Sequence, residues 1–375
     1  MIRSTFAIAP MVLLAACAAP ASDEAGNTAA DLTGQDGLGE VLEPREDALV
    51  KEVAGAATKQ LSQAQAESGD KVARRDAHPK AHGCVTGSFE VRNDVPADLR
   101  GDTFQPGKRY PTWVRFSNGT KQDDRKDDAR GMAIKLLGVS GPRLLTSEAP
   151  NTMTHDLVLT NHDKFFITNL ADYVKFMNAL TEKGSPLSFF LSFNNFHPRE
   201  AFLARQFTTQ PISSPLTSRY WSATPYKLGN QAVKYSMQPC AGADVSGKHP
   251  DAENYLATAM KGQLASGDAC FDFMVQRRSN PDSMPIEDST IAWEESQSPF
   301  VKIATLTIPK QTFDTPAQEK LCENLSFTPW HATQEHRPLG SMNRTRRVAY
   351  EATSTFRHKL NGTARVEPTD LTVPR

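Results

Sequence analysis

Apolar and polar positions repeat with different periods along this 375-residue chain, and the period separates expected helices from expected strands. Early in the chain, apolar residues recur at every fourth position. They are Leu49, Val53, Ala57 and Leu61. This spacing places them on one face of a helix, so a helix laid across the core is predicted from about 45 to 68.

From residue 87 to 139 the period shortens to that of strands. The segments SFEVR, TWVRFS and GMAIKLLGV are short, apolar and separated by Pro, Gly and Asp or Asn. DLVLT, further along the chain, has the same character. Turn-forming residues end one strand and begin the next, so a series of short strands is predicted here.

The second half of the chain mixes both kinds of element. Helices are predicted at 169–180 and from about 199 onward, and strands at AVKYSM, CFDFMVQR and VKIATLTI. A last helical section is predicted near the C-terminus. Strands, inserted helices, further strands and a terminal helix together predict an α+β fold with an antiparallel β-barrel at its centre.

The first sixteen residues have the pattern of a removable leader. Arg3 is followed by an apolar run from 6 to 16, which is too short to span a membrane permanently. Leu-Ala-Ala precedes Cys17, a pattern similar to that of bacterial lipoproteins, in which the cysteine is acylated. We therefore expect 1–16 to be a lipoprotein signal peptide and Cys17 to carry the lipid. The alternative is an ordinary secretory signal with a chance cysteine.

The residues after the cysteine bear on location and domain organisation. Ala18 replaces the aspartate of retained lipoproteins, and this resemblance favours the periplasmic face of the outer membrane, with acyl chains as the anchor. Residues 17–43 are rich in Ala, Gly, Asp, Glu and Thr and are predicted to be a flexible tether. Residues 44–375 have a globular composition without a repeat or second linker, and are predicted to be one domain.

Composition excludes one class of partner and leaves the disulfides open. The chain holds 42 Lys and Arg against 43 Asp and Glu, a balance that argues against nucleic acid as the partner. Four cysteines follow Cys17, namely Cys84, Cys240, Cys270 and Cys322. In an oxidising compartment they can pair in three complete ways, and Cys84 is equally a candidate for a buried thiol.

The segment RTRRVAYEATSTFR carries the clearest chemical signal. On a helix, Arg346 lies one turn before Tyr350 and Arg357 lies two turns after it, so the three share roughly one face. A tyrosine phenol has a pKa of about 10 in water, and a neighbouring guanidinium favours the phenolate. A phenolate can bind ferric iron, and tyrosine is one of the axial ligands of haem.

Five segments resemble the catalase family and occur in the family's order. They are RRDAHPKAHG, VRFSNG, DDARGMAIKL, HDLVLTNHDKFFI and the segment around Tyr350. The lead-in EHRPLGSMNR, residues 335–344, makes the chain look most like the smaller catalase-related haem peroxidases. The resemblance implies an antiparallel β-barrel with flanking helices, and haem b held against helices outside the barrel.

The resemblance also implies roles for residues on the two sides of the haem. His78 matches the distal base that exchanges a proton with peroxide, and Ser117 matches the partner that fixes its ring. His82 is the nearest rival for the base. On the proximal side, Tyr350 matches the iron ligand and Arg346 the residue that keeps it charged.

Further positions match contacts to the haem periphery. Three arginines match the family's partners of the haem carboxylates, namely Arg75, Arg115 and Arg357. A guanidinium suits a carboxylate because it offers paired N–H donors. Tyr173 falls where the family places a phenylalanine on the haem ring, although an ordinary core aromatic fits the same pattern.

Two positions depart from the family. Thr160 stands where catalases have an asparagine, and its hydroxyl lacks the two N–H donors of an amide. Asn161 would need a bulge to substitute, because neighbours on a strand face opposite sides. Gly119 stands where a valine commonly narrows the access channel, so wider access is expected.

These features predict a haem-dependent peroxidase or catalase-related enzyme that reduces hydrogen peroxide or organic hydroperoxides with a small-molecule reductant. Both departures favour peroxidase action over rapid dismutation. One alternative is a haem-binding or storage lipoprotein with little turnover. Another is a haem enzyme that rearranges lipid hydroperoxides. The sequence leaves open the physiological peroxide and reductant, and whether the protein forms a homo-oligomer.

Overall fold

The computed structural model describes residues 33–34, 36–69, 72–75, 77–145, 153–192, 195–244 and 246–373. The predicted leader, Cys17 and most of the predicted tether lie outside these residues. Among the helices that are described, none combines the length and the apolar character needed to cross a bilayer.

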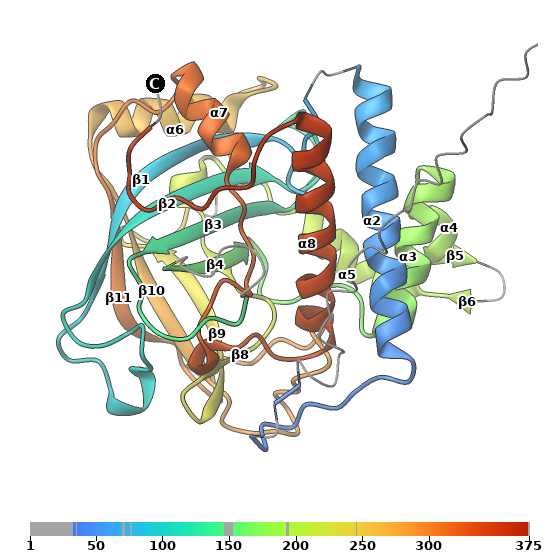
Figure 1. Cartoon of the computed structure of the whole chain (residues 1–375), viewed down its shortest axis with the longest axis horizontal. Coiled ribbons are helices and arrows are strands. Elements are labelled where there is room, and N and C mark those ends of the chain that lie inside the picture. The colour runs from blue at the N-terminus through green and yellow to red at the C-terminus, as the bar shows by residue number, and fades with distance from the viewer. Residues whose placement is uncertain are drawn as a thin grey trace, which may run out of the picture.

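Eight antiparallel strands form a closed barrel in the described part of the chain (Figure 1). In chain order they are β1 (Ala81–Val91), β2 (Arg109–Asn118), β3 (Arg130–Leu137), β4 (Thr154–Thr160), β7 (Tyr220–Trp221), β9 (Gln231–Pro239), β10 (Ala269–Arg277) and β11 (Val301–Ile308). The ring closes because β10 pairs with both β9 and β11. Closure removes the open edges at which antiparallel sheets otherwise aggregate.

Shorter strands and the helices surround this ring. β8 (Tyr226–Leu228) extends β9, and β5 (Leu191–Ser192) pairs with β6 (Asn195–Phe196). The α-helices are α2 (Glu46–Ser68), α3 (Leu170–Lys183), α4 (Leu187–Phe190), α5 (Pro198–Thr208), α6 (Tyr255–Ser266), α7 (Pro316–Asn324) and α8 (Ser341–Asn361). Single 3-10 turns occur at η1 (Ala97–Leu99), η2 (Pro215–Thr217) and η3 (Gln334–His336).

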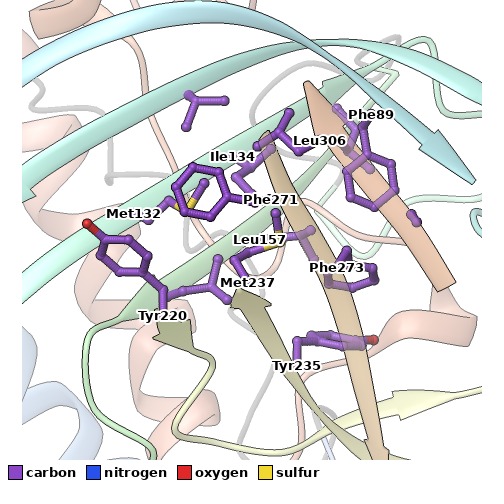
Figure 2. Packing of buried hydrophobic residues seen from close by; sticks show 14 of the residues in the cluster. Phe89, Met132, Ile134, Leu157, Tyr220, Tyr235, Met237, Phe271, Phe273 and Leu306 are labelled. Atoms are coloured by element: carbon purple, nitrogen blue, oxygen red, sulfur yellow. The ribbon is translucent and has the colours of Figure 1, made fainter. Parts of the chain in front are cut away.

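The inside of the barrel is filled by the side chains of its own strands (Figure 2). The Phe273 ring centroid lies 5.2 Å from that of Phe89 and 5.1 Å from that of Phe104. Tilted and edge-on ring pairs at this spacing stabilise a core beyond the apolar area that they bury. The interior therefore serves stability, and the helices outside the ring are the elements that can frame a site.

One flank of the barrel is covered by α8, which lies between the barrel and α2, with α3 beyond (Figure 1). Small side chains let these helices approach closely: Val53 and Ala57 of α2 pack with Ala349 of α8 and Val174 of α3. The helix predicted from 45 to 68 is thus confirmed, and the face with the four-residue repeat is its buried face.

A buried arginine fixes the start of α8 to the N-terminal stretch. Arg344 is completely buried. Its guanidinium lies 2.8 Å from a Glu40 oxygen, 2.5 Å from Glu46 and 3.2 Å from Glu287. A buried charge is stable only when it is paired. The folded domain therefore includes residues 36–43, which corrects the C-terminal boundary of the predicted tether.

The predicted architecture, an α+β fold with an antiparallel barrel and flanking helices, is confirmed. The predicted strands and the helices at α3, α5 and α8 are also found. However, β1 begins at Ala81, earlier than expected, and neither α6 nor α7 was predicted. Two glycines in AHGCVTG obscure the strand pattern there, since glycine weakens the β signal.

Two disulfides resolve the pairing that the sequence left open. Cys84 of β1 is bonded to Cys322 of α7, and Cys240 is bonded to Cys270 at the adjoining ends of β9 and β10. The Cα atoms are 5.6 Å apart in both bridges, within the range of ordinary disulfides. All four cysteines of the domain are therefore paired.

Candidate functional site

A cavity lies between the outer face of the barrel and α8. Residues of β2, β3 and β4 line one side, and one face of α8 lines another. Most of the residues predicted for the site belong to its wall, namely Arg75, His78, Arg115, Ser117, Tyr350 and Arg357. Segments from both ends of the domain therefore meet at one place.

The α8 side of the cavity follows helical periodicity. Tyr350, Thr353, Ser354 and Arg357 lie three or four residues apart and all line the cavity. The opposite face of the helix packs on α2. The helix ends at Gly362, whose φ of 60° is a left-handed conformation that glycine adopts without strain.

Arg346 lies one turn before Tyr350 and contacts its phenol. Arg346 Nε donates to the Tyr350 hydroxyl oxygen at 3.3 Å, and Nη1 donates to Asn343 Oδ1 at 3.1 Å. Burial alone lowers the pKa of Arg346, but the oxygens of Tyr350 and Tyr226 raise it above its ordinary value. A permanent positive charge is thus fixed beside the phenol oxygen.

His78 has a left-handed backbone, with a φ of 59°. Histidine tolerates this region better than most residues, yet such a conformation costs on the order of 1–3 kcal/mol. Two hydrogen bonds hold it: the His78 N–H donates to the Gly119 carbonyl at 2.7 Å, and Arg115 Nη2 donates to the His78 carbonyl at 2.8 Å. The ring is consequently presented from a fixed backbone.

The His78 ring is held between Ser117 and Gly131. Ser117 Oγ lies 3.0 Å from His78 Nδ1. A Cβ atom on Gly131 would lie 2.6 Å from ring atoms Cε1 and Nδ1, so a glycine is required at this position of β3. Because Nδ1 is engaged by Ser117, Nε2 is the ring nitrogen left for proton exchange.

The environment keeps His78 neutral. Burial lowers its pKa to about 4, and the positive charge of Arg115 acts in the same direction. An imidazole with this pKa carries no charge near neutral pH and can accept a proton.

Three arginines gather on one side of the cavity. Burial and the charge of Arg75 lower the pKa of Arg115 well below its ordinary value, and Arg357 adds to the effect. Arg115 Nε is buried and makes no hydrogen bond within the described part of the protein. Arg75 and Arg357 reach the same carboxylate, with Glu323 Oε1 at 3.2 Å and 3.4 Å respectively. The region is strongly cationic and suits an anionic ligand.

Sequence reasoning missed Arg365, which also lines the cavity. It follows α8 in a segment without regular structure, and burial lowers its pKa to about 10. It belongs to no motif and no periodic pattern that would have pointed to it. Glu323 was missed for the same reason.

Arg346 contacts Tyr350 without being part of the cavity wall, and two further predicted residues, Tyr173 and Thr160, lie outside the wall as well. Tyr173 packs in an aromatic cluster, with its ring centroid 5.9 Å from that of Phe165 and 6.4 Å from that of Phe176. Thr160 ends β4, and its hydroxyl donates to the Arg130 carbonyl at 3.2 Å. It pairs across the strands with Gly131, the glycine beside the His78 ring. Thr160 therefore lies next to Gly131, the residue against which the His78 ring packs.

The two rivals for distal roles are engaged elsewhere. Asn161 is buried, its Oδ1 accepts from the Arg130 N–H at 2.7 Å, and it is not part of the described cavity wall. His82 Nε2 lies 2.9 Å from Asn118 Oδ1, and burial lowers the pKa of His82 to about 3. Both residues belong to the packed barrel rim.

Gly119 has a structural explanation that differs from the expected one. A Cβ atom there would lie 2.9 Å from Asp128 Oδ1 and 3.2 Å from the Ala129 carbonyl oxygen. These contacts belong to the turn before β3, and Gly119 is not part of the described cavity wall. The glycine serves close packing, which corrects the expectation that it widens an access channel.

Known proteins are similar to this chain in sequence and in fold. The model of the family described as Catalase matches residues 56–196. The "Catalase-related peroxidase" of Mycolicibacterium paratuberculosis is 27% identical over 302 residues, which cover 75% of this chain and 88% of that protein.

Solved structures of catalases share the fold. A bacterial catalase has a TM-score of 0.58 with 19% identity, and the match covers 82% of this chain and 63% of that chain. A fungal catalase has a TM-score of 0.59 with 19% identity, covering 79% and 62%. Catalase A from Saccharomyces cerevisiae has a TM-score of 0.59 with 18% identity, covering 80% and 65%. The matched part thus spans less than two thirds of each of these catalases. The family match over 56–196, the similar peroxidase and the shared barrel show that this chain has the fold of catalases and is similar to a catalase-related peroxidase.

Proposed function

We propose that this protein is a haem-dependent peroxidase that reduces hydrogen peroxide or organic hydroperoxides, with Tyr350 as the iron ligand and His78 as the distal base. One observation carries the proposal. A single cavity brings together a neutral, oriented histidine and a tyrosine backed by a buried arginine.

The residues of the cavity fit haem b in their chemistry. Leu61, Val158 and Phe327 offer apolar surface for a macrocycle. Arg75, Arg115 and Arg357 offer guanidinium groups for two carboxylates, and Arg115 Nε is a buried donor with no partner in the described structure. Bound haem would supply a ferric iron at which the peroxide O–O bond is cleaved.

His78 provides the proton transfer that this cleavage requires. Its Nε2 takes the proton from one peroxide oxygen and delivers it to the other, so that water or an alcohol leaves. Its low pKa keeps it ready to accept, while Ser117 and Gly131 hold the ring in place. A storage protein needs no such oriented base, and this disfavours the haem-storage alternative.

Arg346 supports Tyr350 on the other side. Its Nε donates to the phenol oxygen, and its positive charge compensates a negative charge there. Asn343 and Tyr226 accept from the same guanidinium and keep it in place. Tyr350 is therefore the side chain best prepared to act as an anionic iron ligand.

Thr160 favours peroxidase action over dismutation. Dismutation requires a second hydrogen peroxide molecule to be held and oriented, a task to which a side-chain amide contributes. Thr160 has no amide, and Asn161, whose Oδ1 accepts from the β3 backbone, is not part of the described cavity wall. We therefore assign a peroxide and a small reductant as the substrates, with organic hydroperoxides as good as hydrogen peroxide.

The test uses purified protein reconstituted with hemin. Turnover is measured with hydrogen peroxide, with cumene hydroperoxide and with a fatty acid hydroperoxide, each with an aromatic reductant, while oxygen release is recorded in parallel. Peroxidase turnover above oxygen release is the expected result. Rapid oxygen release at catalase rates refutes the role given to Thr160. Isomerised lipid hydroperoxide without consumption of reductant supports the rearranging enzyme instead.

We also propose that the protein is a lipoprotein anchored on the periplasmic side of the outer membrane through Cys17. The support is the Leu-Ala-Ala-Cys leader followed by Ala18. In a Gram-negative host, the wild type should carry lipid on Cys17 and sediment with membranes, whereas Cys17→Ser should not. Mass spectrometry that finds an unmodified N-terminus in the wild type contradicts the anchor.

A further inference from the structure

We infer that the Cys84–Cys322 disulfide positions the arginines that meet the haem carboxylates, and thereby sets the affinity of the protein for haem. The inference rests on the proposed haem site and extends it to a bond outside the cavity wall. The disulfide joins β1 to α7. The end of α7 contacts Arg75 and Arg357, and β1 pairs with the strand of Arg115.

The disulfide fixes α7 on β1. Cys84 lies in β1 and Cys322 near the end of α7, and both are almost fully buried. Gln318 of α7 adds a hydrogen bond from its Nε2 to the Cys84 carbonyl at 2.8 Å. Leu321 and Cys322 pack with Trp113 of the barrel, and the disulfide is the covalent link between this nine-residue helix and β1.

The end of α7 holds Arg75. Arg75 Nη2 donates to the carbonyl oxygens of Cys322 at 3.2 Å and of Glu323 at 3.3 Å, and also to that of Leu325. The last carbonyls of a helix have no partner within the helix and carry its partial negative charge, which favours a cation there. The guanidinium of Arg75 is therefore located by α7 and follows it.

The same helix end holds Arg357 of α8. Arg357 Nη1 donates to the Glu323 carbonyl at 2.6 Å, and Glu323 Oε1 lies 3.4 Å away. The Glu323 carboxylate thus lies between Arg75 and Arg357 and offsets part of their repulsion. Cys322, the residue before Glu323, carries the disulfide.

The other cysteine is in register with Arg115. In the β1–β2 pair, Cys84 is the direct partner of Arg115. Burial and the charge of Arg75 lower the pKa of Arg115, and the charge of Arg357 acts in the same direction. Like charges at this spacing separate unless the structure holds them. One covalent bond therefore connects the supports of all three guanidinium groups.

The second disulfide provides a matched control. Cys240–Cys270 joins β9 and β10, and neither strand contributes to the described cavity wall. Each apo protein is titrated with hemin, and the dissociation constant is measured by absorbance and tryptophan fluorescence. We expect C84S/C322S to bind hemin about tenfold more weakly, the scale of one charge-assisted hydrogen bond, and C240S/C270S to bind like the wild type.

A thermodynamic cycle separates positioning from general loss of stability. Arg75→Gln is made in the wild type and in C84S/C322S. We expect the second loss of hemin affinity to be several-fold smaller than the first, since Arg75 is no longer held without the disulfide. Equal losses in both backgrounds overturn the inference, as does an unchanged affinity in C84S/C322S.

Two further outcomes are distinguishable. If C84S/C322S does not fold, the C240S/C270S protein is treated with a dithiol reductant, which opens only the remaining bridge, and hemin affinity is compared before and after. A lower hemin affinity after reduction supports the inference, and an unchanged affinity overturns it. If the wild type itself does not bind hemin, the proposed haem site is wrong. If the wild type binds hemin and the affinity does not change without the disulfide, only the present inference is wrong.

Discussion

The two functional walls of the cavity are built in different ways. The α8 wall is a regular helix face, on which Tyr350 and Arg357 are separated by two turns and Arg346 lies one turn before the phenol. The His78 wall is irregular. It depends on a left-handed residue, a glycine of β3 and hydrogen bonds to β2 and Gly119.

The two walls also differ in the charge state of their key residues. On α8 a buried guanidinium stays charged, because tyrosine oxygens raise the pKa of Arg346. On the other wall burial and Arg115 lower the pKa of His78, so the imidazole stays neutral. One wall is prepared to hold an anion and the other to move a proton. Substitutions in the two walls should therefore impair different properties.

Tyr350→Phe should produce the largest effect, and it should fall on binding. Hemin affinity should drop by more than about 100-fold, because even the outer partners of metal ligands are worth 10–100-fold. Absorbance titration of the apo protein measures the loss. Tyr226→Phe is the matched control, since it removes another phenol that contacts Arg346 and should keep binding within a few-fold. An unchanged affinity in Tyr350→Phe, or a histidine-type spectrum in the wild type, refutes the assignment.

His78→Gln should impair turnover and leave binding nearly intact. We expect peroxide consumption to fall on the order of 100-fold or more, the scale of general acid–base catalysis. Stopped-flow kinetics measures the rate, and a hemin titration checks the cofactor. His82→Gln, which alters a histidine outside the cavity, should retain the rate. Loss of rate in the His82 variant alone would move the base to that residue.

Arg115→Gln should weaken hemin binding about tenfold, an intermediate effect that tests the cationic side of the cavity. The reason is the loss of a buried guanidinium that faces the proposed carboxylates. The ligand itself supplies the control, because the dimethyl ester of hemin carries no carboxylate charge. Equal weakening towards hemin and its ester would show that Arg115 acts only through the His78 backbone.

A smaller effect should appear in the pH dependence of stability. The folded pKa of His78 is about 4, below its usual 6.5, so the unfolded chain binds more protons between these values. Stability from this group is complete above pH 6.5 and is lost as the pH falls towards 4. His82 acts in the same direction. His78→Gln should therefore show a shallower decline of Tm from pH 6.5 to 4 than the wild type. Parallel curves would contradict a neutral, buried His78.

Sequence patterns predicted the α8 wall because a helix places residues by a short period. The barrel strands were predictable for the same reason, since their period is two. The His78 wall is different: Ser117 is 39 residues away, and β1 and β2 shift register between Ala81 and Gly83. No local pattern encodes such a contact, and only the family resemblance pointed to it.

Contacts over longer separations escaped the sequence entirely. Cys84 and Cys322 are 238 residues apart, and three pairings were equally compatible with the sequence. Arg365 and Glu323 carry no motif, so their place beside the cavity follows only from the packing of α7 and α8 on the barrel. Gly119 was misinterpreted because its neighbours are Asp128 and Ala129, whose approach depends on the fold.

The contact between Glu40 and Arg344 has a consequence for proteolytic release. A protease that cuts before residue 33 would leave a product in which the carboxylates of Glu40, Glu46 and Glu287 still surround Arg344. A cut after residue 43 would remove Glu40 and leave the first turn of α8, six residues before Tyr350, with one ion pair fewer. The two products would differ by only a short peptide. Only the first would keep the ion pair between Glu40 and Arg344 at the start of α8.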